Sequence, residues 1–336
     1  MDVRLGAHGH GCAGAAVTPE PGGSPRYRKL EVAAEMSRSK HARRWWLVAI
    51  AMMLPLWPLM AMASTPDAAI VVSTPALPVR SCPAVTCDTL IEAPLGADIA
   101  VDGDVEDGFL PVTYAGTSGY ALPAFVATDP DDPPVFAAGS PGCQRVAFLF
   151  NIGVGFPPDI GIIDTLEREE VPAAMFVMGW WVDEAPPLLD RLVNDGYLIG
   201  SHGYGSTELT TLSDDAVLDD ITHAATAIEE ATGQPQAPYF TPYAAAIDAR
   251  VRAIVAGQGF LPVAWEVPAA DYGANITADQ VYRKVMDNMY DGAIVEFHLD
   301  GEASAQSTGV ALPRIIDDLR AQGYQFVSLP DLMLPC

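Results

Sequence analysis

The sequence predicts an α/β domain, either a parallel barrel or a doubly wound sheet, preceded by a small all-β barrel. From Cys143 onward, apolar runs of strand length alternate with stretches of helix length, giving about six β–α units. Between residues 67 and 128, turn-forming residues interrupt short apolar runs every 8–12 residues or so, a spacing typical of small β-barrels.

The composition fits a globular protein that does not bind nucleic acid. The chain has 336 residues and is 50% hydrophobic, which is enough for two domains and a sizeable core. Its formal net charge is −25, whereas binding to phosphates requires a basic face. We therefore expect no nucleic-acid partner.

The first 63 residues predict a secretory signal peptide that starts late. Residues 36–63, "MSRSKHARRWWLVAIAMMLPLWPLMAMA", combine a basic start, an apolar run and an Ala-x-Ala site, which is the layout of such a signal. Residues 1–35 are then expected to be a non-translated or disordered extension, with translation starting at Met36. An uncleaved anchor is the alternative, because the 19 residues from Trp45 to Ala63 are just long enough to span a bilayer.

This segment sets the expected location. The protein is predicted to be secreted or associated with the cell envelope, and to contact a membrane only through an uncleaved signal segment.

Four cysteines follow the signal segment, and an even number in an exported chain predicts disulfides. Cys82 and Cys87 lie close together in "SCPAVTC", while Cys143 and Cys336 bracket the second domain. We expect the bridges Cys82–Cys87 and Cys143–Cys336, with free buried thiols as the alternative.

Residues 67–128 resemble a bacterial SH3-like domain in the stretches "LPVRSCP", "PLGADIAV", "GFLPV" and "SGYALPAFV". Such modules are often attached to cell-wall enzymes, so the resemblance implies a peptidoglycan or peptide ligand. A spacer without a ligand is the alternative. Residues 129–142 are rich in Pro and Asp and predict a linker.

Strands and helices alternate through residues 143–336. The predicted strands cover residues 145–151, 174–177, 197–201, 261–265, 293–298 and 325–329. The predicted helices cover residues 160–169, 185–194, 214–232, 249–258, 278–290 and 309–322.

Residues 143–336 resemble the polysaccharide deacetylases, also called the NodB-homology domain or carbohydrate esterase family 4. The stretches "GIIDTLEREEVPAAMFVMGWWVDEAPPLLDRLVNDGYLIGSHGYGSTELTTLS" and "EEATGQPQAPYFTPYAAA" carry this resemblance. It implies a distorted, incomplete (β/α) barrel with its site at the carboxyl ends of the strands.

The resemblance also implies metal-assisted amide hydrolysis. A divalent ion, usually zinc, is held by one Asp and two His, polarises the acetyl carbonyl and activates a water. A second Asp acts as the base, an Arg holds that Asp, and a His backed by an Asp protonates the leaving amine.

Four positions of this chain depart from that pattern. Asn151 stands where the base is expected, and an amide does not accept a proton near neutral pH. Ile152 replaces the metal-binding Asp, and Ser206 replaces the second metal-binding His. Thr241 stands in place of the Arg, so these are four degenerate positions.

The acid half of the pattern is retained in His298 with Asp271. His202 is the one expected metal ligand that remains, and a single His does not hold zinc. We therefore expect no resident metal.

Glu296 takes a position that the resemblance assigns to an apolar Leu. Alternate residues of a strand face the same side, so Glu296 and His298 should both point toward His202. These three side chains form either a relocated site for zinc or another divalent metal, or a polar sugar pocket. The third possibility is that Glu296 only fills space and bonds Asn151, Ser206 or Thr241.

Aromatic side chains are expected to complete this pocket. Tyr243 follows Thr241 in "FTPY", and Trp265 ends a predicted strand. The predicted pocket therefore consists of His202, Tyr243, Trp265 and Glu296.

These observations predict an exported, deacetylase-like protein with a degenerate site that binds a polysaccharide or peptidoglycan-like glycan without catalysis. The alternative is an active, metal-dependent deacetylase of N-acetylated polysaccharide that uses the relocated site. The sequence leaves open whether the chain is an enzyme.

Overall fold

The computed structural model describes residues 67–336 except residue 185. The predicted extension and signal peptide, residues 1–63, lie outside the described residues. Among the helices of the described part, none is both long enough and apolar enough to cross a membrane.

Seven short strands between residues 67 and 127 form one antiparallel sheet in the order β3-β2-β6-β5-β4-β1-β7. Alternate residues point inward, as in β2, where Leu77 and Val79 are buried. The assignment of this sheet to the SH3-like class stays a prediction. The strands are β1 (Asp67–Val71), β2 (Ala76–Arg80), β3 (Thr89–Pro94), β4 (Asp98–Val101), β5 (Leu110–Tyr114), β6 (Thr117–Ala121) and β7 (Val126–Ala127).

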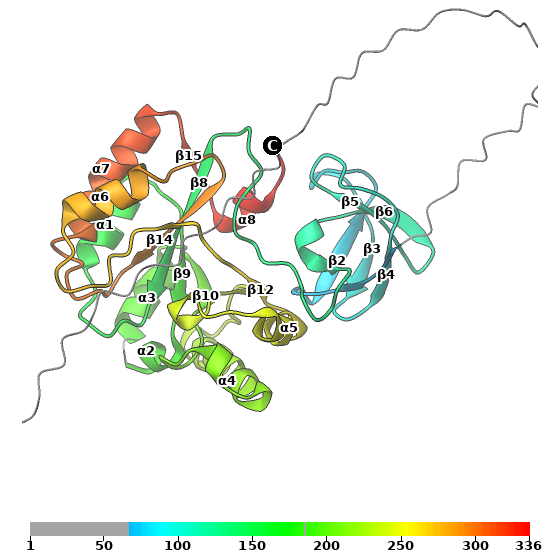
Figure 1. Cartoon of the computed structure of the whole chain (residues 1–336), viewed down its shortest axis with the longest axis horizontal. Helices are drawn as coiled ribbons and strands as arrows, with labels where there is room; N and C mark the ends of the chain where they lie inside the picture. The colour runs from blue at the N-terminus through cyan, green and yellow to red at the C-terminus, as the bar shows by residue number, and fades with distance from the viewer. Residues whose placement is uncertain (1–66, 185) are drawn as a thin grey trace, which may run out of the picture. The chain divides into compact units, whose positions relative to one another are not determined.

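The second sheet is parallel and has eight strands in the order β12-β11-β10-β9-β8-β14-β13, with β15 also paired to β8. Its end strands β12 and β13 do not pair with each other, so the sheet curls without closing (Figure 1). The predicted incomplete (β/α) barrel is confirmed. The strands are β8 (Arg145–Ile152), β9 (Ala173–Val177), β10 (Leu198–Ser201), β11 (Tyr239–Phe240), β12 (Leu261–Pro262), β13 (Val267–Pro268), β14 (Ala293–His298) and β15 (Gln325–Phe326).

Eight helices belong to the described part of this domain, and Figure 1 shows them around the sheet, with α6 beside α7. Several begin at the residues that favour helix starts. Ser213 caps α4 by accepting from Ala216 N, and Thr277 caps α6 in a capping box with Gln280. The helices are α1 (Ile160–Arg168), α2 (Gly179–Glu184), α3 (Pro186–Asn194), α4 (Asp214–Thr232), α5 (Ala249–Gly257), α6 (Ala278–Met286), α7 (Thr308–Ala321) and α8 (Leu329–Met333).

Two predicted strands are longer than the observed ones. The strand predicted over residues 325–329 ends at Phe326, because Ser328 caps α8 by accepting a hydrogen bond from Asp331 N. The strand predicted over residues 261–265 extends only over β12. The sequence analysis missed the short strands β11 and β13 and the short helices α2 and α8.

Both predicted disulfides are confirmed. Cys82 pairs with Cys87 and Cys143 pairs with Cys336, each with 5.7 Å between the Cα atoms. The guanidinium of Arg145 also donates to the carbonyl oxygens of Asp331 and Leu334. The end of the chain is therefore held against the start of β8.

Candidate functional site

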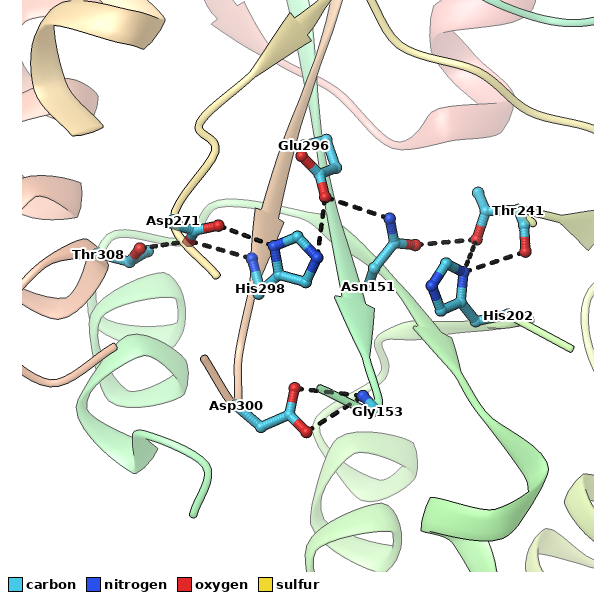
Figure 2. A network of polar contacts seen from close by, with 9 residues as sticks. All are labelled: Asn151, Gly153, His202, Thr241, Asp271, Glu296, His298, Asp300 and Thr308. Carbon is cyan, nitrogen blue, oxygen red and sulfur yellow. Dashed lines mark hydrogen bonds and ion pairs between the residues drawn. The ribbon is translucent and has the colours of Figure 1, made fainter. Parts of the chain in front are cut away.

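Polar side chains meet at the carboxyl edge of the parallel sheet, where the ends of several strands converge. Asn151 lies near the end of β8, His202 follows β10, and Thr241 follows β11. Asp271 follows β13, while Glu296 and His298 belong to β14. Figure 2 shows these side chains as one connected polar network.

The first half of the network joins His202 to Asn151 through Thr241. The His202 ring contacts the Thr241 carbonyl oxygen at 3.0 Å and its hydroxyl at 2.8 Å, both through Nδ1. Since a carbonyl only accepts, Nδ1 of His202 carries the proton and Nε2 keeps its lone pair. The Thr241 hydroxyl in turn donates to Asn151 Oδ1 at 2.9 Å.

The second half joins Asn151 to His298 through Glu296. Asn151 Nδ2 donates to Glu296 Oε1 at 3.3 Å, and His298 Nε2 lies 3.2 Å from the same oxygen. Asn151 is one of the three hydrogen-bond partners that the sequence analysis left open for Glu296. Glu296 is only 3% exposed, and a buried carboxylate requires such partners.

Asp271 holds the other side of the His298 ring. Its Oδ1 lies 2.8 Å from His298 Nδ1, and its Oδ2 accepts from the His298 backbone N–H and from the Thr308 hydroxyl. The expected pairing of His298 with Asp271 is present. Both ring nitrogens therefore face carboxylates, and His298 Nε2, the atom that an acid would use to deliver a proton, is ion-paired with Glu296.

The burial of the network shifts the titration of its groups. Burial lowers the pKa of His298, but the Glu296 and Asp271 carboxylates outweigh this effect and raise the pKa to about 9. Burial raises the pKa of Glu296 to about 7. Burial and the charge of His298 lower the pKa of His202 to about 3, so this ring is neutral.

A cavity of about 630 Å³ opens at this edge of the sheet. All four residues of the predicted pocket line it, as do Asn151, Ser206 and His298. Thr241 and Asp271 are fully buried behind the cavity wall. Ile152 does not line the cavity, because it packs in the hydrophobic core on the other side of β8.

The residues present do not fit the metal that the resemblance implies. Among the three expected ligand positions only His202 offers a suitable atom, since Ile152 is apolar and the Ser206 hydroxyl contacts Met178 Sδ at 3.7 Å. Over residues 67–336, apart from residue 185, no group of three His, Cys, Asp or Glu side chains is placed to hold an ion.

The sequence analysis missed Asp300, which is buried and holds the backbone of Gly153, a residue that lines the cavity. Its carboxylate accepts from the backbone N–H groups of Gly153 and Gly155 at 3.0–3.2 Å (Figure 2). Gly153 has φ +139°, and a Cβ there would lie 2.5 Å from Met178 Sδ. The sequence signal that could have found Asp300 is its spacing, because it lies two residues after His298 and continues the alternation of Glu296 and His298.

Tyr272 is a second missed residue. It lines the cavity, and its ring meets the His298 ring edge-on with 5.6 Å between centroids. It directly follows Asp271, so the same loop supplies one residue behind His298 and one in front of it.

The family comparison agrees with this architecture. The family model described as polysaccharide deacetylase matches residues 138–263. Over these residues the chain is similar to the polysaccharide deacetylases. This similarity and the curled parallel sheet agree with the resemblance stated from the sequence.

A curated relative and a solved structure of this family are also similar to the chain. The peptidoglycan-N-acetylglucosamine deacetylase PgdA of Listeria monocytogenes is 32% identical over 190 residues, which are 56% of this chain and 39% of the relative. The structure of Bacillus subtilis PdaA, a family 4 carbohydrate esterase, is 26% identical with a TM-score of 0.55, over 59% of this chain and 84% of that one.

The second structure is a family 4 carbohydrate esterase pseudoenzyme from Bacillus anthracis. It is 21% identical with a TM-score of 0.55, over 77% of this chain and 90% of that one. At this identity the likeness extends to the fold alone.

We predict that Asn151 and Glu296 are energetically coupled. Asn151→Asp removes the Nδ2 donor and places a second carboxylate against Glu296, so it should lower the free energy of unfolding by about 2–4 kcal/mol. In the Glu296→Leu background the same change should lower it by less than about 1 kcal/mol. Urea denaturation of the wild type, Asn151→Asp, Glu296→Leu and the double variant measures the coupling. Ser206→Ala is the control, because it leaves the network intact. Additive effects would contradict the coupling.

We also predict that the folded protein holds His298 as an imidazolium at neutral pH. NMR titration of its ring should give a pKa near 9 in the wild type and a lower pKa in Glu296→Leu. The folded state binds this proton more tightly than the unfolded chain does, so the proton stabilises the folded protein. This stabilisation is fully present below pH 6.5, the ordinary pKa of His, and is lost as the pH rises through about 9. A wild-type pKa near 6.5 would refute the prediction.

Proposed function

We propose that this protein is a glycan-binding member of the polysaccharide deacetylase family that has lost metal-dependent catalysis. The observation that carries the proposal is the line of polar contacts from His202 to Asp271. In it, Asn151 stands where the base is expected and donates to Glu296, which forms an ion pair with His298 Nε2.

The chemistry of the donor set supports the loss of hydrolysis. Asn151 does not accept a proton near neutral pH, and neither Ile152 nor Ser206 supplies a good metal ligand. Each absent element normally stabilises the transition state by several kcal/mol or so. We expect rates near background.

The cavity supports a retained role in binding sugars. It is lined by Tyr243, Trp265 and Tyr272 together with polar side chains, and such rings offer both an apolar face and a polar edge. The named relative acts on peptidoglycan N-acetylglucosamine. We infer a polysaccharide or peptidoglycan-like glycan as the partner and the cell envelope as the place of action.

The all-β part and the signal segment belong to the same proposal. An SH3-like module over residues 67–128, joined through the linker 129–142 to residues 143–336, would hold the chain at the cell wall. Export through residues 36–63 would deliver it there.

The alternative is an active deacetylase with a relocated metal at His202, Glu296 and His298. It gains no support from the geometry, because both nitrogens of His298 face carboxylates and Glu296 Oε1 already accepts two contacts. An ion at this place would have to displace the His298 proton.

We predict that the full-length protein binds N-acetylglucosamine oligomers or peptidoglycan but does not deacetylate them. Acetate release with added Zn²⁺, Co²⁺ or Mn²⁺ should equal that of a protein-free control. Trp265→Ala should weaken binding by about tenfold, because it removes a large ring from the cavity wall. Leu218→Ala, an exposed apolar residue on α4, is the matched control. Metal-stimulated acetate release that a chelator abolishes would overturn the proposal.

A further inference from the structure

The buried floor of the cavity consists of Asn151, His202, Glu296 and His298, and most of its hydrogen-bond donors are already engaged. One N–H of the Asn151 amide donates to Glu296, while His298 contacts Asp271 through Nδ1 and forms an ion pair with Glu296 through Nε2. His202 donates its one ring proton to Thr241. This floor therefore offers a ligand few donors, of which the second N–H of the Asn151 amide is one.

Two acceptors of the floor are uncommitted. His202 Nε2 keeps a lone pair, since Nδ1 holds the proton. In the described part of the chain, Glu296 Oε1 accepts both contacts and no hydrogen bond reaches Oε2. Oε2 has no hydrogen-bond partner among the described residues but is not one of the fully buried atoms that lack one. It is therefore accessible from the cavity that Glu296 lines.

The charges around the floor favour a ligand that brings positive charge. Glu296 and Asp271 flank the single cation His298, and the buried Asp300 adds a third carboxylate beneath the backbone of Gly153, which lines the cavity. Within the described residues, the cavity lining contains no Lys or Arg. It instead contains Tyr243, Trp265 and Tyr272, and aromatic rings can attract ammonium groups.

An N-acetyl group suits this floor poorly. Its carbonyl oxygen needs a donor, and the floor offers few. Its methyl group would meet the polar side chains of the floor rather than an apolar surface. A free amine brings up to three N–H donors and takes a positive charge when protonated, which matches two open acceptors beside a carboxylate.

We propose that the cavity selects hexosamine units with a free amine over N-acetylated units. The ligand class is therefore a de-N-acetylated amino sugar within a glycan chain, the product of a deacetylation rather than its substrate. This inference rests on the proposed glycan-binding function and names its ligand.

The test compares two chitin oligomers of equal length in calorimetry with the full-length protein at neutral pH. One is fully N-acetylated, and the other carries a single free amine. A single amine is chosen because a polycationic oligomer would bind this chain of net charge −25 without specificity. We expect the amine-bearing oligomer to bind about tenfold more tightly, as for one charge-assisted hydrogen bond.

Two variants assign the preference to Glu296. Glu296→Gln keeps the size of the side chain and Glu296→Leu removes its polarity, and both should reduce the preference to about twofold or less. Glu302→Gln, an exposed carboxylate outside the cavity lining, should keep it. Circular dichroism identifies a variant that has lost its fold, and the other one then decides.

The outcomes separate the two proposals. Equal or tighter binding of the N-acetylated oligomer by the wild type overturns the amine preference and leaves glycan binding intact. A preference that survives Glu296→Gln also overturns it. If neither oligomer binds, the proposed function fails and this inference fails with it.

Discussion

The pairing of β8 with β14 is the constraint on which the site depends. This parallel register sets His298 opposite Asn151 and Glu296 opposite Leu149, which brings Asn151 Nδ2 to 3.3 Å from Glu296. Both strands are buried at the centre of the sheet, so a slip in their register would move apolar side chains out of the core. The core therefore fixes the geometry of the polar network at the strand ends.

Within that register, the departures from the deacetylase pattern depend on one another. A carboxylate at position 296 would face a second carboxylate if the base were kept at position 151, and two buried carboxylates at this distance do not ionise together. With Asn151 the pair becomes a hydrogen bond, and Thr241 completes it from the other side. Where the deacetylase pattern has groups that move protons and hold an ion, Asn151, Thr241 and Glu296 form hydrogen bonds with one another.

Much of the fold was predictable because local signals agree with the tertiary structure. Ser213 and Gly233 bound α4 as its cap residues, and long apolar runs predicted β8 and β14. The short strands β11 and β13 were missed, since two residues carry no periodicity. The site residues were predicted from motifs, but their contacts were not. The ion pair of Glu296 with His298, the hydrogen bonds from Gly153 to Asp300 and the burial of Ile152 in the core all depend on register between distant segments.

The measurement that tests this account most directly is the metal content of the full-length protein, by elemental analysis as isolated and by calorimetry with Zn²⁺. If the ligand set has been replaced by the hydrogen-bonded network, the protein should carry no stoichiometric ion and show no tight binding of zinc. One tightly bound ion per chain, lost on His202→Ala or Glu296→Leu, would contradict the account. It would mean that the network opens to hold a metal.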